Sequence, residues 1–368
     1  MNKRILKNID WSILIYVLIL TVIGLMALYS ATINDDLLEF KKQCMWIAIS
    51  IPIMIAIVFI DYNIISRFSP YLYGLSIVLL IAVLFTPAIN GASSWFNLGF
   101  FAFQPAELAK VFVIIFLSTV ITNIQKKSKQ EINRPLKLLT ILGVVALPVL
   151  LIVMQPDYGS AIAYILSLIL ILFVSGINKK YIIVSLVLIT ILLPIMYFFI
   201  LPEHAKSRID VYLNPNIDPR GAGYNIIQSK IAVGAGKFFG MGLFKGTQTH
   251  LGFLYPKTTD FIYSVIGEEM GFIVAGAIII LYVILITKII YVAKTAKDNI
   301  GSYTAIGIAG VFVFYMVENI GMTMGLLPIT GVPLPFVSYG GSALMTNFIL
   351  IAIVLNISGR RQKAIFIE

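Results

Sequence analysis

Long apolar runs separated by short polar segments set the pattern of this chain. A helix needs roughly 20 apolar residues to cross a bilayer core of about 30 Å, so runs of that length predict transmembrane helices. We find ten such runs, at 11–31, 44–60, 69–87, 105–125, 138–155, 159–177, 181–201, 264–290, 303–326 and 337–358. The pattern predicts an all-α integral membrane protein in which residues 1–368 form a single polytopic domain.

The composition agrees with a membrane protein and excludes several other classes. Of the 368 residues, 59% are hydrophobic and 12% are charged, about half the roughly 25% of an ordinary globular chain. These values exclude an intrinsically disordered chain, and the single cysteine, Cys44, excludes a disulfide-stapled scaffold. The net charge of +10 is not gathered in a basic cluster with interleaved aromatic residues, so we expect no nucleic-acid partner. An anionic membrane surface or an anionic lipid-linked substrate fits this charge better.

The positions of lysine and arginine predict the orientation in the membrane. With a cytoplasmic N-terminus, most of these residues fall in segments that face the cytoplasm, as the positive-inside rule requires. An even number of spans returns the C-terminus to the same side. The chain is therefore predicted to have both termini in the cytoplasm.

One long hydrophilic segment, about 202–262, interrupts the apolar runs and lies outside the cell in this topology. Apolar positions at helical spacing from Tyr224 to Phe238 predict a helix that lies in the outer interface. The glycines that follow, up to Gly246, predict close turns. The segment is rich in basic residues, which are Lys206, Arg208, Arg220, Lys230, Lys237, Lys245 and Lys257.

Several familiar catalytic motifs are missing from the sequence. It contains no GxxxxGK phosphate loop, GxGxxG fingerprint, HExxH or CxxC motif, so nucleotide hydrolysis, dinucleotide redox chemistry and a zinc site have no support. With only two histidines, His204 and His250, and one cysteine, a Ser-His or Cys-His nucleophile is disfavoured. Of the catalytic chemistries considered, one that uses a carboxylate side chain remains.

Charged residues at membrane depth are costly and therefore mark candidate sites. Glu107 and Lys110 lie three residues apart in QPAELAK and hence on one helix face. Two interpretations of this pair remain open, a structural ion pair and a substrate-binding site. For Glu268, Glu269 and Glu318 we favour a packing or polar-network role.

Asp260 stands out in the outer segment. It is the only acidic residue between positions 219 and 267, and it is surrounded by basic residues and glycine-rich turns. A single carboxylate in a basic cleft is suited to act as a base on an anionic substrate. The alternative is that Asp260 caps the helix that follows it. Trp95 is most simply an interfacial aromatic anchor, and Asp157 is most simply a turn residue.

Four stretches of the sequence closely resemble the SEDS family of polytopic bacterial cell-wall proteins. They are GASSWFNLGFFAFQPAELAK, QPDYGSA, the stretch from RIDVYLNPN to SVIGEEMGF, and ENIGMTMGLLPITGVPLPFVSYGGSALMTNF. The GTQT and TDFIYSVIGEE segments resemble elongation-type members more than division-type members. The resemblance implies ten transmembrane helices, a long extracytoplasmic loop between helices 7 and 8, and peptidoglycan glycosyltransferase activity in the bacterial cytoplasmic membrane.

The resemblance also assigns candidate site residues. The family's candidate catalytic acid in the TDF motif corresponds to Asp260, its loop tryptophan to Trp95, and its PAE glutamate to Glu107. Other matching motif positions are Lys110, Asp157, Arg208, Gln248, Ser338 and Tyr339. The chain departs from the family pattern just before Asp260, where it lacks a histidine that many relatives have, so no role for that histidine transfers. The positions concerned are Tyr255, Pro256 and Thr258, and Ser94 replaces a basic residue often found before the tryptophan.

The reaction implied by the resemblance uses lipid II as its substrate. Asp260 would take the proton from the GlcNAc 4-hydroxyl of the acceptor. Arg208, Lys245 or a divalent cation, Mg²⁺ or Mn²⁺, would stabilise the diphosphate that leaves the donor. Attack from the opposite face converts an α-linked donor into a β-1,4 bond, so we expect an inverting mechanism.

The resemblance further implies protein partners. The chain has no serine-nucleophile motif of its own for peptide crosslinking, so a class B penicillin-binding protein is expected to supply the transpeptidase. Other membrane proteins of the elongation complex are expected as well. Three alternatives remain at this point, namely a lipid II flippase, a scaffold that only recruits a transpeptidase, and a division- or sporulation-type paralogue.

Overall fold

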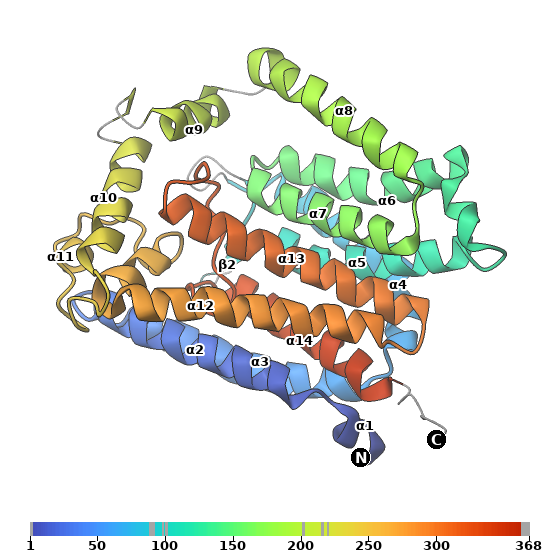
Figure 1. The fold of residues 1–368 in the computed structure, drawn as a ribbon, viewed down its shortest axis with the longest axis horizontal. Helices are drawn as coiled ribbons and strands as arrows, with labels where there is room; N and C mark the ends of the chain where they lie inside the picture. The colour runs from blue at the N-terminus through green and yellow to red at the C-terminus, as the bar shows by residue number, and fades with distance from the viewer. Residues whose placement is uncertain are drawn as a thin grey trace.

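The structure, a computed structural model, describes residues 3–87, 93–97, 99, 102–200, 203–214, 217–218 and 221–361. Helices form almost all of its regular structure (Figure 1). The first half of the chain forms α1 (Lys3–Asn8), α2 (Trp11–Thr32), α3 (Leu38–Phe59), α4 (Tyr62–Val83), α5 (Pro105–Ile124), the 3₁₀ helix η1 (Lys129–Asn133), α6 (Pro135–Val153) and α7 (Tyr158–Ser175). The second half forms α8 (Lys179–Ile195), the π-helix η2 (Met196–Ile200), α9 (Glu203–Leu213), α10 (Ala222–Ala235), α11 (Thr247–His250), α12 (Ile262–Lys294), α13 (Asn299–Thr323) and α14 (Gly341–Arg360). A short antiparallel pair, β1 (Phe96–Asn97) and β2 (Ala102–Phe103), precedes α5.

Nine helices of the described chain are long and apolar enough to cross a membrane, as expected of a multi-pass membrane protein. They are α2 to α7 and α12 to α14, and they coincide with nine of the ten apolar runs. The remaining run, 181–201, corresponds to α8, which has 17 residues and continues into η2. Because each of the nine has at least 18 residues, α8 falls just short of them, and the tenth span stays a prediction.

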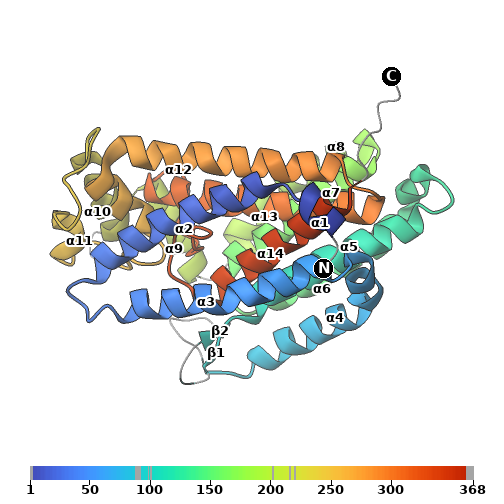
Figure 2. The same ribbon diagram turned by 90° about the horizontal axis from the view of Figure 1, so that it is seen from below.

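Helices α13 and α14 form the interior of the bundle, whereas α3, α4 and α6 leave most of their surface exposed. Figures 1 and 2 show α13 and α14 surrounded by other helices, with α8 at the edge of the molecule. Small residues let α13 approach α7 closely, because a Cβ at Gly307 or Gly310 would meet the side chain of Ile171 or the backbone of Ser167. The Ser167 hydroxyl also donates to the carbonyl of Gly307 over 3.0 Å. Close packing and this hydrogen bond therefore hold α7 against the interior.

Helix α12 is interrupted at Gly271, whose φ of 76° favours glycine. The turn that follows α10 lies against this break and satisfies its backbone groups. Phe272 donates its N–H to the carbonyl of Lys237 over 2.8 Å, and Met241 donates to the carbonyl of Glu268 over 2.9 Å. Irregular backbone at membrane depth is stable only when its polar groups are paired in this way.

In its described parts, the hydrophilic segment between η2 and α12 contains the helices α9, α10 and α11, with turns after α10 and α11. The helix expected from Tyr224 to Phe238 is α10, which ends at Ala235, and the glycine-rich turns follow it as predicted. Its position in the outer interface stays a prediction. Arg220 and the side chain of His204 lie outside the described residues.

Candidate active site

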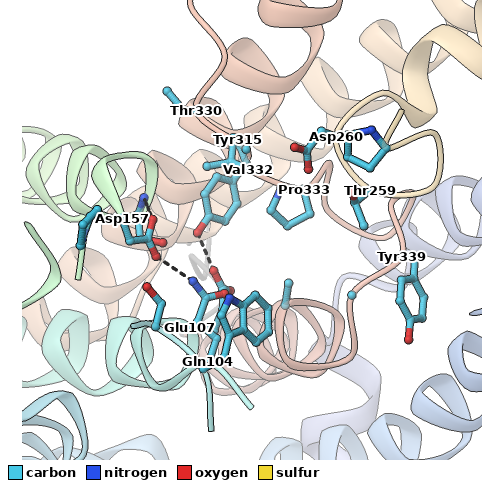
Figure 3. Close-up of a pocket in the computed structure, with 18 of the residues that line it drawn as sticks. Gln104, Glu107, Asp157, Thr259, Asp260, Tyr315, Thr330, Val332, Pro333 and Tyr339 are labelled. Carbon is cyan, nitrogen blue, oxygen red and sulfur yellow. Dashed lines mark hydrogen bonds between the residues drawn. The ribbon is translucent and has the colours of Figure 1, made fainter. Parts of the chain in front are cut away.

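A cavity of about 510 Å³ collects residues from segments that are far apart in the chain. The beginnings of α5 and α7 form one wall, and the segment before α12 forms another. The stretch 330–340 completes the lining together with parts of α9, α10 and α13. Of the predicted site residues, six line this cavity, namely Trp95, Glu107, Asp157, Arg208, Asp260 and Tyr339. Figure 3 shows Asp157 and Asp260 on opposite sides of Tyr315.

Glu107 belongs to the first turn of α5, which Pro105 starts because its fixed φ suits the first helical position. Its Oε1 atom lies 3.0 Å from Nζ of Lys110 and accepts a hydrogen bond of 2.8 Å from the hydroxyl of Tyr315. The same hydroxyl contacts Lys110, whose Nζ lies 4.2 Å from the centre of the Tyr315 ring. The ion pair expected from the spacing is therefore present, with a third member from α13.

The Glu107 carboxylate also has a free oxygen. Glu107 is 2% exposed, lines the cavity, and its Oε2 atom has no hydrogen-bond partner among the described residues. Lys110 is fully buried behind it. A buried carboxylate oxygen without a donor is costly unless a ligand or water supplies one. Glu107 thus forms an ion pair with Lys110 through Oε1 and keeps Oε2 as a free hydrogen-bond acceptor at the cavity. Its role in substrate binding stays a prediction.

Asp157 is the N-cap residue of α7, which confirms its role in the turn. Its Oδ1 atom accepts the N–H of Ser160 over 3.0 Å, and its Oδ2 atom accepts from Nε2 of Gln104 over 2.7 Å. Burial raises the pKa of this carboxyl above its usual value. Gln104 was missed by the sequence analysis, although it is the first residue of QPAELAK and the residue before Pro105.

Asp260 does not cap α12, so that alternative is wrong. The helix begins at Ile262, and its N-cap residue is Phe261, whose side chain has no polar atom. Asp260 instead lines the cavity (Figure 3). Burial raises the pKa of its carboxyl, while a hydrogen bond with Thr259 and the charge of Arg208 oppose this rise. A carboxyl with a raised pKa is a stronger base than a free aspartate, which suits proton abstraction.

The backbone around Asp260 is held by neighbouring segments. Nδ2 of Asn319 donates to the carbonyl of Asp260 over 3.0 Å and to that of Val332 over 2.9 Å. The hydroxyl of Ser338 donates to the carbonyl of Thr259 over 2.7 Å. Ser338 therefore lies behind the cavity wall, where it positions the segment that carries Asp260.

Trp95, which precedes β1, and Arg208, in α9, both line the cavity although they are far apart in the chain. Trp95 is only partly exposed, and its position in the lining differs from that of a simple anchor in the lipid interface. Its neighbour Ser94 donates to the carbonyl of Gln155 over 3.0 Å, which fixes this loop next to Asp157. Arg208 comes from α9 and donates to the carbonyl of Ile329 over 3.4 Å.

The other four predicted site residues, Lys110, Lys245, Gln248 and Ser338, lie outside the described lining of the cavity. Gln248 belongs to α11, where its N–H donates to Glu268 over 2.7 Å. Thr249 donates to the same carboxylate, and His250 pairs with Glu269 at 2.8 Å. Glu268 and Glu269 therefore have the polar-network role that the sequence favours. The roles of Lys245 and Gln248 in substrate binding stay predictions.

A divalent cation would need oxygen ligands from this cavity. Three carboxylates, Glu107, Asp157 and Asp260, line it. In the part of the chain that the structure describes, however, no group of three or more His, Cys, Asp or Glu residues is arranged to hold a metal ion. Arg208 is the one basic side chain in the described lining of the cavity.

Residues 10–363 match the family described as cell cycle protein, which takes its short name from FtsW, RodA and SpoVE. The chain belongs to this family. It is 37% identical to the peptidoglycan glycosyltransferase MrdB of Escherichia coli K12, over 96% of this chain and 95% of the relative. It is 30% identical to the peptidoglycan glycosyltransferase RodA of Treponema pallidum, over 98% and 100%. It is 35% identical to the stage V sporulation protein E of Bacillus subtilis, over 95% and 96%.

Solved structures agree with this assignment. A chain of a peptidoglycan synthase complex that coordinates polymerization and crosslinking superposes with a TM-score of 0.83 at 26% identity, over 95% of this chain and 97% of that chain. A mutant of the rod shape determining protein RodA of Thermus thermophilus superposes with a TM-score of 0.72 at 25% identity, over 96% and 99%. These matches confirm the family inferred from the sequence motifs.

Proposed function

We propose that the cavity polymerises lipid II into β-1,4-linked glycan strands during cell elongation, with Asp260 as the general base. The chain is a peptidoglycan glycosyltransferase, the activity named for its relatives in Escherichia coli and Treponema pallidum. The observation that carries the proposal is the position of Asp260 in a polar cavity opposite Glu107 and Asp157 and in the field of Arg208.

The reaction requires one proton transfer and one displacement. Asp260 takes the proton of the acceptor 4-hydroxyl, and the oxygen attacks the anomeric carbon of the donor. The bond from that carbon to the diphosphate breaks, and the electron pair leaves with the diphosphate. Arg208 stabilises the departing charge from the cavity wall. Because the nucleophile enters opposite the leaving group, the anomeric configuration inverts.

The proposal includes a topology. Residues 1–368 form one domain with ten spans, in which α8 together with η2 makes the seventh span. Both termini are cytoplasmic, and the loop at about 202–262 is extracytoplasmic. The cavity then opens toward the outer face, where the sugars of a lipid-linked substrate would be presented. A cysteine placed at Asp36, between α2 and α3, should be labelled from outside intact cells.

A class B penicillin-binding protein is the proposed partner, together with other membrane proteins of the elongation complex. The similarity to a chain of a peptidoglycan synthase complex supports this partner class. Co-purification with the cognate penicillin-binding protein should yield a complex with higher polymerising activity than the chain alone. A lack of both complex and stimulation would contradict it.

The decisive experiment replaces Asp260 by Asn in the purified protein and measures glycan polymer made from lipid II. We expect the rate to fall by about 10²- to 10⁴-fold, which is the usual contribution of a general base. Because Asp260 does not cap α12, folding and partner binding should be unchanged. The matched control is Asp36→Asn, because Asp36 is exposed and does not line the cavity. Polymer formed by Asp260→Asn at more than about a tenth of the wild-type rate would overturn the role of Asp260.

A further inference from the structure

A second cavity, which we call the α10–α12 groove, has a different chemistry. It measures about 570 Å³ and lies between α10, α12 and the end of α13. Its walls include Val233 of α10, Tyr263, Ala275 and Ile279 of α12, and Met324. Figure 2 shows α12 at one edge of the molecule, and both views show α10 beside its N-terminal part. An apolar groove in this place is open to a ligand that arrives from the surrounding lipid.

The lining of the groove is elongated along α12, as a site for an alkyl or prenyl chain would be. It extends on α12 from Tyr263 to Ile279, on both sides of the break at Gly271. Phe238 and Phe272 flank it with ring centres 5.9 Å apart, and each of the two side chains is 65% exposed. Exposed aromatic rings beside an apolar groove provide further surface for an alkyl or prenyl chain.

The groove adjoins the candidate active site. Asp260 lies three residues before Tyr263 in the chain. Helix α10 contributes to both cavities, with Asn225 in the polar cavity and Val233 in the groove. Eight residues of helix separate these two positions by about 12 Å. An elongated lipid-linked sugar is long enough to reach from one cavity to the other.

The charge of the groove selects an anionic ligand. Lys237 is the one charged side chain in its described lining, it is exposed, and it forms no ion pair with a described carboxylate. A cation at the edge of an apolar groove fits a lipid whose head begins with phosphate.

We propose that the α10–α12 groove binds the polyprenyl chain of the acceptor substrate, with Lys237 near its diphosphate. This inference rests on the proposed function, which supplies the lipid-linked substrates. The diphosphate of the donor leaves from the reacting carbon and must therefore lie beside Asp260. The reacting 4-hydroxyl of the acceptor is two sugar rings away from its own diphosphate, so a phosphate site at a distance from Asp260 fits the acceptor.

Gly276 offers a test that leaves the fold intact. It lines the groove, and a Cβ placed there meets no atom within 4 Å, so the side chain of Gly276→Leu starts in open space and occupies part of the groove. Gly143→Leu in α6 is the matched control, because a Cβ at Gly143 also meets nothing within 4 Å. The full-length variants are compared in nanodiscs with undecaprenyl lipid II, by lipid II binding in native mass spectrometry and by KM and kcat.

We expect Gly276→Leu to weaken lipid II binding and raise KM by about tenfold or more, because loss of two or more buried methylene groups is sufficient for this change. Its kcat should match that of Gly143→Leu. With a lipid-free GlcNAc-terminated disaccharide as acceptor, the two variants should behave alike. Lys237→Gln should raise KM for lipid II as well.

Three outcomes would overturn the proposal. Equal lipid II binding and KM for Gly276→Leu and Gly143→Leu would show that the groove does not bind substrate. An equal defect of Gly276→Leu with lipid-free and lipid-linked acceptors would show that the groove does not bind the polyprenyl chain of the acceptor. A raised KM for the donor alone would assign it to the other substrate. Failure of the proposed function is distinguishable, because wild-type protein would then form no polymer.

Discussion

The hydroxyl of Tyr315 in α13 donates to the carboxylate of Glu107 in α5 over 2.8 Å, and it contacts the amine of Lys110 at the same time. This hydrogen bond connects two helices that form opposite parts of the candidate active site. It also explains how a fully buried lysine and its glutamate are held in one geometry, since buried charges require both pairing and hydrogen bonds.

Tyr315→Phe should therefore destabilise the protein. Loss of a buried hydrogen bond to a charged group costs about 1.5–3 kcal/mol, and it leaves Glu107 and Lys110 less restrained. The measurement is thermal unfolding in detergent. Tyr73→Phe is the control, because the Tyr73 hydroxyl donates to the uncharged carbonyl of Val144 over 3.0 Å. Equal losses for the two variants would contradict a special role of the Tyr315 hydroxyl.

Glu107→Gln should abolish detectable polymerisation while the protein stays folded and inserted in the membrane. The reason is that the free Oε2 atom at the cavity loses its charge, whereas the side-chain shape is kept. Glycan assays with lipid II measure the loss, and thermal unfolding checks the fold. The double variant Glu107→Lys with Lys110→Glu is the complementary test, because it preserves an ion pair. Activity in that double variant would show that the pair is only structural.

The rate should depend on pH through the carboxyl of Asp260. Burial raises its pKa, so kcat/KM should fall on acidification at a higher pH than for a free aspartate, because the base must be deprotonated. Arg208 opposes the rise, so Arg208→Gln should shift this acidic limb to still higher pH. Asp157 also has a raised pKa, and Asp157→Asn should leave the limb in place. If Asp157→Asn moves the acidic limb instead, the general base is Asp157 and not Asp260.

Gly271→Ala should lower stability. Gly271 has φ 76° and ψ −176°, a conformation that essentially only glycine adopts, so alanine there costs on the order of 1–3 kcal/mol, and its Cβ would also meet the turn at Gly240. Gly143→Ala, at an ordinary helical position with open space around it, should be neutral or stabilising. Thermal unfolding of both variants checks this, and similar melting temperatures would rule out a need for glycine at the break in α12.

The sequence by itself determined the class of the molecule and most of its spans. Apolar runs of 20 residues have few stable alternatives in a membrane, because a helix satisfies all backbone polar groups within its own segment. Nine of the ten runs accordingly overlap helices long enough to cross a membrane, although α3 begins at Leu38 and α4 at Tyr62, six and seven residues before the predicted starts. The motifs also determined the family, since their residues are read directly from the chain.

Only the tertiary structure decided which of the candidate residues meet. Glu107, Asp157 and Asp260 come from three separate segments, and their shared cavity depends on how α5, α7 and the start of α12 pack. The sequence also could not decide whether Asp260 caps α12. The first residue of a helix depends on backbone geometry, and sequence patterns locate it only to within one or two residues. Likewise, only the structure shows that the backbone N–H of Gln248 donates to Glu268 of α12, while the side-chain Oε1 atom of Gln248 has no hydrogen-bond partner among the described residues. Long-range packing, which local pattern does not encode, places Tyr315 beside Glu107 and leaves the α10–α12 groove open.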